Sequence, residues 1–310
     1  MIPAYNEVEN LPVLLQKVQE VLATILEKKE TYEIICIDDG STDDTIFFLR
    51  KICKKDFRVK FLSFSRNFGH QAALKAGLDA SLGNCVVTMD ADLQHPPKLI
   101  PTLYKYWKQG SDIVYTVRLN TEKSSFVKDT ISRFFYSLFR VLGGVELETG
   151  AADFRLLDRK VVNIIKTLPE TVLFLRGMFV WVGFSKKAIL YTADKRFKGT
   201  SKYSLRKMIL LALSGITSFS TRPLYIAIVL GLFFSFLSGV YGLYAVSMFL
   251  FVGTLVLPGW ASIITSILFI GGLQLCMLGI LGMYIGHMYI ETKKRPLYIV
   301  SSSSENMNNS

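Results

Sequence analysis

Short apolar runs alternate with amphipathic segments over the first part of the chain. The apolar runs predict strands at Glu33–Asp38, Val59–Ser63, Cys85–Met89 and Ile113–Val117, with Met1–Ile2 as the short end of an earlier strand. Helical spacing marks the segments between them, at 10–28, 42–54, 69–82 and 97–109. Strands separated by helices predict an α/β domain with a mainly parallel sheet, which we place at residues 1–200.

The second part of the chain has a different pattern. From Pro223 to Ile290 there is no Asp, Glu, Lys or Arg. Pro258 and Gly259 interrupt this run. The pattern predicts two transmembrane helices, at 223–251 and 261–290, each long enough to cross a bilayer.

The charges beside these helices predict their orientation. Nine basic residues and one acid lie between positions 185 and 222, the 252–260 loop has no charge, and three basic residues follow the second helix. The positive-inside rule therefore places both ends in the cytoplasm and the loop outside. The N-terminus lacks the pattern of a signal peptide, so we expect the α/β domain to stay in the cytoplasm. The tail, 291–310, ends in the polar segment Ser301–Ser310, which we expect to be disordered.

Two further segments have amphipathic helical spacing. In 126–142 the apolar residues lie on one face and Arg133 and Arg140 on the other. Packing against the core and lying in the membrane interface both explain this pattern. The basic segment 201–222 predicts a juxtamembrane helix that leads into the membrane.

The net charge of +11 is informative about binding partners mainly because of where the basic residues lie. Because the basic cluster adjoins the apolar region, it favours lipid headgroups or a phosphate substrate over nucleic acid. The apolar spans carry no acidic or basic residue of the kind that pumps need at membrane depth, so they are expected to be an anchor and a lipid-docking surface. The four cysteines are far apart in sequence and indicate core residues in a reducing compartment.

Three acidic segments follow three predicted strand ends: Pro3–Glu7, Asp38–Asp43 and Asp90–His95. Loops at the carboxyl ends of parallel strands converge on one crevice, so these segments predict a ligand site. Each segment alone is weak, because a DxD sequence is common and Asp38–Asp43 also fits a helix cap. Asp90 and Asp92 offer hard oxygen ligands that, with a nucleotide diphosphate and water, suit Mg²⁺ or Mn²⁺. Zinc is not expected, since no His or Cys cluster is present.

Six motifs in order carry a family resemblance: IPAYNE, DDGSTD, RNFGHQAAL, DADLQHPP, DFRL from Asp153, and KGTSKY from Lys198. With them the chain resembles family 2 glycosyltransferases of the GT-A fold, and within these the polyprenyl-phosphate glycosyltransferases. It is most similar to bacterial undecaprenyl-phosphate (bactoprenol) glucosyltransferases. Dolichol-phosphate mannose synthases resemble the catalytic part. The resemblance implies an integral protein of the bacterial inner membrane, a nucleotide-sugar donor and a polyprenyl phosphate acceptor.

The resemblance also implies roles for individual residues. The nucleotide-sugar would be bound by Pro3, Tyr5, Glu7, Asp38, Asp39, Asp90 and Arg118. The metal would be bound by Asp90, Asp92 and Gln94, with Asp92 also counted as catalytic. The acceptor phosphate would be bound by Arg133, Arg196, Ser201 and Lys202.

Asp153 would be the catalytic carboxylate that faces the acceptor. A phosphate monoester has a second pKa of about 6, so this nucleophile hardly needs a general base. Orientation of the acceptor and stabilisation of positive charge at the anomeric carbon are the alternatives, and a structural pair with Arg155 is a third. The expected reaction is a single displacement that inverts the anomeric configuration.

Two other functions stay open. A processive polysaccharide synthase shares the GT-A core, although this chain has no QxxRW sequence and only two predicted spans. A non-catalytic partner in lipid-linked sugar translocation is the other. The subgroup implies UDP-glucose, while UDP-GlcNAc, GDP-mannose and modified arabinose donors are alternatives. Glycines in the apolar spans (Gly231, Gly239, Gly271, Gly279 and Gly282) suit close helix packing and a homo-oligomer.

Overall fold

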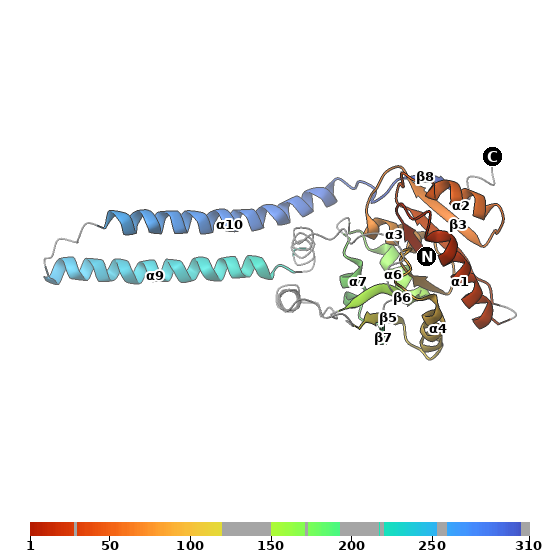
Figure 1. The fold of residues 1–310 in the computed structure, drawn as a ribbon. Coiled ribbons are helices and arrows are strands. Elements are labelled where there is room, and N and C mark those ends of the chain that lie inside the picture. The colour runs from red at the N-terminus through yellow and green to blue at the C-terminus, as the bar shows by residue number, and fades with distance from the viewer. Residues whose placement is uncertain are drawn as a thin grey trace.

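An α/β domain and a pair of long helices make up the molecule (Figure 1). The computed structural model describes residues 1–27, 30–119, 150–170, 173–192, 217, 220–252 and 259–304. The predicted segment 126–142 and most of 201–222 lie outside these residues.

The elements of the α/β domain agree with the predicted ones up to residue 118. Its strands are β1 (Ile2–Ala4), β2 (Ile34–Asp38), β3 (Val59–Phe64), β4 (Cys85–Thr88), β5 (Ile113–Arg118), β6 (Ala151–Asp158), β7 (Lys186–Tyr191) and β8 (Val300–Ser303). Its helices are α1 (Leu11–Ile25), α2 (Thr45–Cys53), α3 (His70–Ala80), η1 (Pro97–Leu99), α4 (Ile100–Lys108), α6 (Arg159–Thr167) and α7 (Leu175–Trp181). The predicted α/β class is confirmed.

The strands form two four-stranded sheets, in the orders β1-β2-β3-β8 and β4-β6-β5-β7. Strand β1 pairs with β2, β2 with β3, and β5 with β7 in parallel, whereas β3–β8, β4–β6 and β5–β6 are antiparallel. The expectation of a mainly parallel sheet is therefore wrong. Two antiparallel pairs arise because β6 lies between β4 and β5, and the third because β8 arrives from the far end of the sequence.

Met1 joins the two sheets. Its amino group donates to the carbonyl of Val87 at 2.6 Å, and the N–H of Met89 donates to the carbonyl of Met1 at 3.2 Å. These bonds place β1 beside β4, so the carboxyl ends of β1, β2 and β4 lie along one edge.

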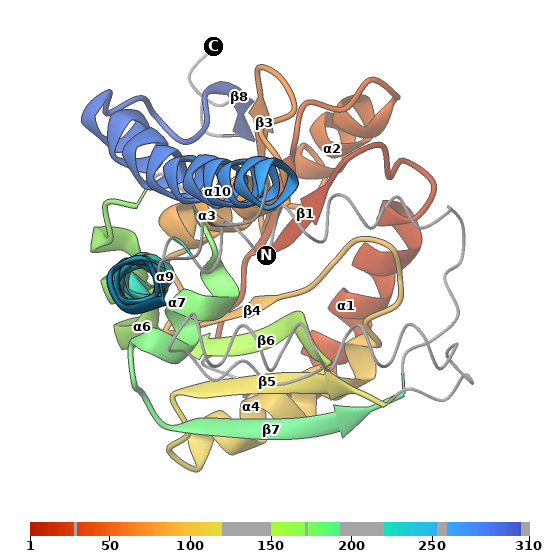
Figure 2. The same cartoon turned by 90° about the vertical axis from the view of Figure 1, so that its left-hand side faces the viewer.

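Helices cover both faces of the first sheet, and β2 shows why. Ile34 and Cys36 pack in a cluster with buried residues of α1 and α4, while Ile35 and Ile37 pack with alanines of α3. This is the alternation of a strand with both faces buried. Helices α6 and α7 extend the α3 side through Leu74 and Leu78 (Figure 2).

The C-terminal segment returns to the sheet as its edge strand β8. Its Ser301 Oγ donates to the carbonyl of Ser63 at 3.0 Å. Just before β8, Tyr298 stacks on Phe64 with ring centroids 5.0 Å apart and donates to Asp79 Oδ2 at 3.1 Å. The expected disorder of 301–310 is wrong for 301–304, because main-chain pairing needs no apolar side chains; residues 305–310 lie outside the described part.

Helices α9 (Arg222–Val252) and α10 (Trp260–Thr292) project from the domain (Figure 1). Both are apolar enough, and long enough, to cross a membrane. Large apolar side chains such as Phe236 and Leu268, each 71% exposed, cover their surfaces. Phe234 of α9 contacts Phe269 of α10, with ring centroids 5.7 Å apart, so the two helices lie side by side.

Candidate active site

The loops after β1 and β2 are joined by hydrogen bonds. The N–H of Asn6 donates to Ser41 Oγ at 2.9 Å, and the N–H of Thr42 donates to Asn6 Oδ1 at 2.8 Å. The N–H of Glu7 donates to Thr45 Oγ1 at 3.0 Å. Asn6 has a φ of 58°, a conformation that asparagine tolerates better than most residues. The first two acidic segments therefore lie together, as the strand order predicts.

Asp38 and Asp39 use their carboxylates within the protein. Asp38 accepts the N–H of Ser41 at 3.1 Å and the hydroxyl of Ser63 at 2.7 Å. Asp39 accepts the N–H groups of Phe68 and Gly69. Burial raises the pKa of Asp39, and these two N–H bonds oppose the shift. Both carboxylates thus fix the loops that would surround a ligand.

Pro3, Tyr5 and Glu7 lie at the end of β1 and just beyond it. Pro3 is buried and pairs with Ile37 of β2, whereas Tyr5 is 37% exposed. Glu7 Oε2 accepts the side-chain N–H of Asn10 at 2.5 Å, which fixes it at the start of α1.

The loop after β4 carries Asp90, Asp92 and Gln94. The N–H of Asp90 donates to His95 Nδ1 at 3.0 Å, and the N–H of Gln94 donates to Asp92 Oδ1 at 3.1 Å. Leu93 has a φ of 63°, so the loop turns sharply between the two carboxylates and Gln94. Within the described residues, Asp90 Oδ1 is buried and has no hydrogen-bond partner.

Asp153 lies on β6 and is surrounded by cationic groups. Arg176 donates through Nε to Oδ1 at 2.9 Å and through Nη2 to Oδ2 at 2.8 Å. Arg155 Nη2 donates to Oδ1 at 3.2 Å. His70 Nε2 lies 3.5 Å from Asp153 Oδ2 and 3.5 Å from Asp90 Oδ1. His70 thereby brings Asp153 and Asp90 to the same place.

These contacts determine the ionisation of the cluster. Burial alone would raise the pKa of Asp153, but Arg176, His70 and Arg155 hold it well below its ordinary value. Burial would lower the pKa of His70, yet Asp153 and Asp90 raise it overall. Asp153 is therefore ionised throughout the neutral range.

Arg118 ends β5 on the same side of the domain. Burial raises the pKa of the Tyr191 hydroxyl, Arg118 lowers it, and Asp90 and Asp92 raise it further. These charges therefore lie within electrostatic reach of Tyr191. The other predicted residues, Arg133, Arg196, Ser201 and Lys202, lie outside the described part of the chain.

Two site residues were not predicted, His70 and Arg176. His70 lies in the RNFGHQ motif directly after Gly69, at the start of α3, so its place in the motif could have identified it as a site residue. Arg176 lies in an apolar segment, and nothing in the spacing connects it to Asp153. Only the approach of α7 to β6 reveals this pairing.

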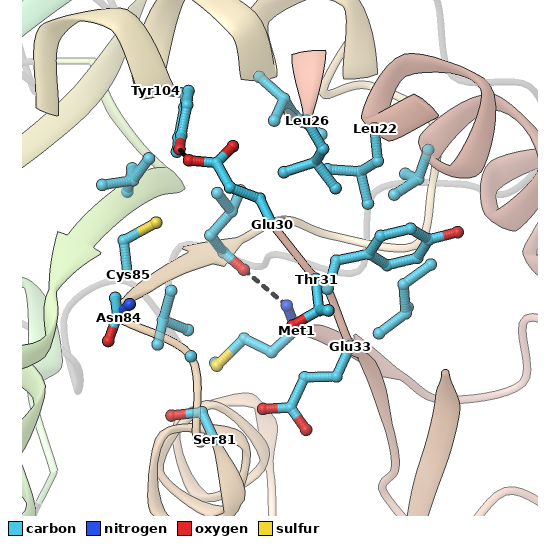
Figure 3. Close-up of a pocket in the computed structure, with 18 of the residues that line it drawn as sticks. Met1, Leu22, Leu26, Glu30, Thr31, Glu33, Ser81, Asn84, Cys85 and Tyr104 are labelled. Atoms are coloured by element: carbon cyan, nitrogen blue, oxygen red, sulfur yellow. Dashed lines mark hydrogen bonds between the residues drawn. The ribbon is translucent and has the colours of Figure 1, made fainter. Parts of the chain in front are cut away.

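A cavity of about 610 Å³ lies elsewhere (Figure 3). Its lining includes Glu33 and Ile34 at the start of β2 and Cys85 at the start of β4. Asp38 is the last residue of β2 and Asp90 follows β4, so both lie at the opposite ends of the same two strands. This cavity is therefore separate from the carboxylate cluster.

The loop after β4 suits a hard divalent cation. No group of three or more His, Cys, Asp or Glu side chains suited to a metal occurs among the described residues. However, Mg²⁺ is commonly held by one or two carboxylates together with substrate phosphates. Asp90 and Asp92 meet that requirement, and Asp90 Oδ1, which accepts no hydrogen bond among the described residues and lies 3.5 Å from His70 Nε2, is a suitable ligand atom.

Known proteins resemble the chain in sequence. Residues 1–165 match the family model described as glycosyl transferase family 2. An uncharacterized glycosyltransferase of Synechocystis sp. is 42% identical over 301 residues, which cover 97% of this chain and 93% of that protein. A bactoprenol glucosyl transferase of Shigella phage SfX is 40% identical over 304 residues, covering 97% of this chain and 98% of that protein. Glucosyl-3-phosphoglycerate synthase from Mycobacterium tuberculosis, a solved structure, has a TM-score of 0.45 and 19% identity over 70% of this chain and 74% of its own.

Proposed function

The chain belongs to glycosyl transferase family 2 and has the GT-A fold, and we propose that it transfers glucose from UDP-glucose to a polyprenyl phosphate. The observation that carries the proposal is the meeting of Asp90 and Asp153 at His70, in a domain joined to two apolar helices. Near-full-length identity of 40% to a protein named bactoprenol glucosyl transferase supports the same acceptor class.

The loops after β1 and β2 would bind the nucleoside. Tyr5 is exposed there, with Pro3 two residues before it on β1 and Glu7 two residues after it in the loop. Asp38 accepts an N–H of its own loop and Asp39 accepts those of Phe68 and Gly69 after β3, so we assign both carboxylates a supporting role around the base and ribose. Arg118 would face the diphosphate from the end of β5.

Asp90, Asp92 and Gln94 would hold Mg²⁺ or Mn²⁺ with the diphosphate of the donor. The ion supplies positive charge that stabilises the departing nucleoside diphosphate. The chain contributes the two carboxylates. The His95 ring fixes the main chain at Asp90 by accepting its N–H, and the N–H of Gln94 donates to the Asp92 carboxylate.

Asp153 would act as a fixed negative charge rather than as a base. Its pKa lies well below the ordinary value, and the acceptor phosphate is already mostly dianionic at pH 7. A carboxylate in this position stabilises positive charge that develops at the anomeric carbon during displacement. The acceptor phosphate would be bound by Arg133, Arg196, Ser201 and Lys202.

The apolar helices would anchor the enzyme with its catalytic domain in the cytoplasm, as the flanking charges favour. A cysteine-free variant carrying Gly259→Cys tests this, because Gly259 lies directly before α10. Impermeant thiol reagents added to intact cells are expected to label Gly259→Cys and to leave Lys294→Cys unlabelled. Labelling of only the Lys294→Cys protein would reverse the orientation.

The reaction is tested with purified protein, undecaprenyl phosphate and radiolabelled nucleotide-sugars. UDP-glucose is expected to give a mild-acid-labile radiolabelled lipid, with less product from UDP-GlcNAc or GDP-mannose. The Asp92→Asn variant is the control for chemistry at this site. A product larger than one sugar per lipid would favour a processive synthase, and no product from any donor would favour a non-catalytic partner.

A further inference from the structure

We infer that Arg176 is a positioning residue for the transfer reaction and that it acts through Asp153. The inference rests on the proposed function and adds a residue from outside the six motifs. Nε and Nη2 of Arg176 lie 2.9 and 2.8 Å from the two oxygens of Asp153. This side-by-side arrangement is the strongest geometry available to an arginine and a carboxylate.

Arg176 determines how the Asp153 carboxylate is turned. Arg155 donates to Oδ1 alone, at 3.2 Å, and His70 approaches Oδ2 alone, at 3.5 Å. Among the described residues, only Arg176 contacts both oxygens within 3 Å. A planar guanidinium bound to both oxygens fixes the plane of the carboxylate, which a lysine cannot do.

Helix α7 is itself held against the site. The N–H of Leu175 donates to Gln71 Oε1 at 3.0 Å, so the start of α7 is tied to the residue after His70. One turn later, the ring of Phe179 lies 4.7 Å from the guanidinium carbon of Arg155. Helix α7 thus supports both arginines that bind Asp153.

Charge and exposure distinguish Arg176 from a purely structural partner. The side chain of Arg155 is 5% exposed and already pairs with Asp153, which is 8% exposed. Arg176 adds a second positive charge and is 42% exposed. One arginine is enough to pair with a buried carboxylate, whereas a second one suits a carboxylate that must keep one orientation while substrates enter and leave.

Steady-state kinetics of Arg176→Gln and Arg176→Lys test the inference in the full-length protein. Arg58→Gln is a matched control, because Arg58 binds Asp56 with the same pair of contacts, at 2.9 and 2.8 Å, on the surface. For Arg176→Gln we expect kcat to fall about 10–100-fold, the range seen when a supporting contact is removed. The donor KM of Arg176→Gln should stay within about twofold of the wild-type value, and Arg58→Gln should match the wild type. Arg176→Lys keeps the positive charge but not the paired N–H donors of the guanidinium, so it should recover only part of kcat.

A double-mutant cycle with Asp153→Asn separates positioning from direct substrate binding. If Arg176 acts through Asp153, the double variant should be no slower than Asp153→Asn alone. Additive losses would overturn the inference, as would a kcat for Arg176→Gln within threefold of the wild type. Thermal unfolding of each variant shows whether a loss of activity comes from a loss of folding. If Arg176→Gln does not fold, the kcat of Arg176→Lys tests the inference in its place. If the wild type and Arg58→Gln formed no glucosyl lipid, the proposed function would fail instead.

Discussion

The main-chain N–H of Asp90 donates to Nδ1 of His95 across 3.0 Å, so this nitrogen carries no proton. The same imidazole stacks on Phe154, with ring centroids 5.3 Å apart. Phe154 directly follows Asp153 on β6. His95 therefore connects the loop of the two metal-binding candidates to the strand that carries the candidate catalytic carboxylate.

Replacement of His95 should slow transfer although the imidazole is buried. His95→Phe keeps a ring against Phe154 but leaves the Asp90 N–H without an acceptor, which costs about 1–3 kcal/mol of stability. We expect kcat to fall about 10–100-fold, because an outer contact of a metal ligand is lost. His95→Asn can present an oxygen near the position of Nδ1 and should recover part of kcat. Equal kcat values for the two variants would contradict this role.

Stability should depend on pH through His95. Burial lowers its pKa, although nearby Asp90 and Asp92 oppose the shift. The unfolded chain takes up a proton at His95 near pH 6.5, whereas the folded protein does so only at lower pH. The contribution of His95 to the free energy of unfolding is therefore complete above pH 6.5 and is lost as pH falls. His70, whose pKa is raised, contributes in the opposite direction. Because the His95→Asn variant retains His70, comparing it with the wild type removes the contribution of His70 to stability. The difference in unfolding temperature between the two proteins should be smaller at pH 5.5 than at pH 7.5. A constant difference would contradict the assignment.

Loss of one carboxylate after β4 should abolish metal-dependent transfer. We expect Asp92→Asn to lower kcat at least about 100-fold. The variant would hold the metal ion less firmly, and this ion supplies the positive charge that stabilises the leaving diphosphate. The unfolding temperature should change little, because Asp92 is partly exposed. The measurement is a titration of EDTA-treated protein with Mg²⁺ and Mn²⁺. Full activity of the wild type in excess EDTA would exclude the metal.

The effect of Asp153→Asn should not vary between pH 6 and 9. With a pKa well below the ordinary value, Asp153 is ionised over this whole range, so the same charge is lost at every pH. Removal of one electrostatic contact of this kind costs about 10²–10³ in rate. Rates are measured for wild type and variant at each pH. Recovery to the wild-type rate by pH 8 would indicate that Asp153 is a general base after all.

The contact between Tyr298 and the domain should stabilise the protein. Tyr298→Ala removes both the stack on Phe64 and the bond to Asp79, and we expect a loss of about 2–4 kcal/mol, mainly from the partly buried ring. Tyr298→Phe keeps the stack and should cost only about 0.5–1.5 kcal/mol. Unfolding temperature and protease cleavage near residue 298 measure the two effects. Similar losses for both variants would show that the hydrogen bond dominates.

The sequence was sufficient for elements whose apolar pattern is local. Strand β2 alternates between two buried faces, and α1 places Leu11, Leu14 and Leu15 on one side, so both were predicted within about three residues. The uncharged segment likewise predicted α9 and α10. In each case the apolar pattern along a short stretch of sequence is enough to indicate the element.

Elements that depend on distant partners were not predicted. Strand β8 consists of Val300 and three serines, and it forms because the edge of β3 offers main-chain groups. The antiparallel insertion of β6 between β4 and β5 also leaves no local signal. The same reason explains Arg176: its partner lies 23 positions earlier on another element, and only tertiary packing brings them together.

The pairing of Leu62 with Ser303 has a consequence for the order of events during synthesis. Strand β3 leaves the ribosome early, whereas its edge partner is made only after α9 and α10. Until then β3 exposes unpaired main-chain groups, the kind of edge that invites aggregation. Closing so long a chain loop is also slow. Synthesis of α9 and α10 thus precedes completion of the first sheet, and a chain that ends before β8 keeps an open edge that chaperones or proteases can recognise.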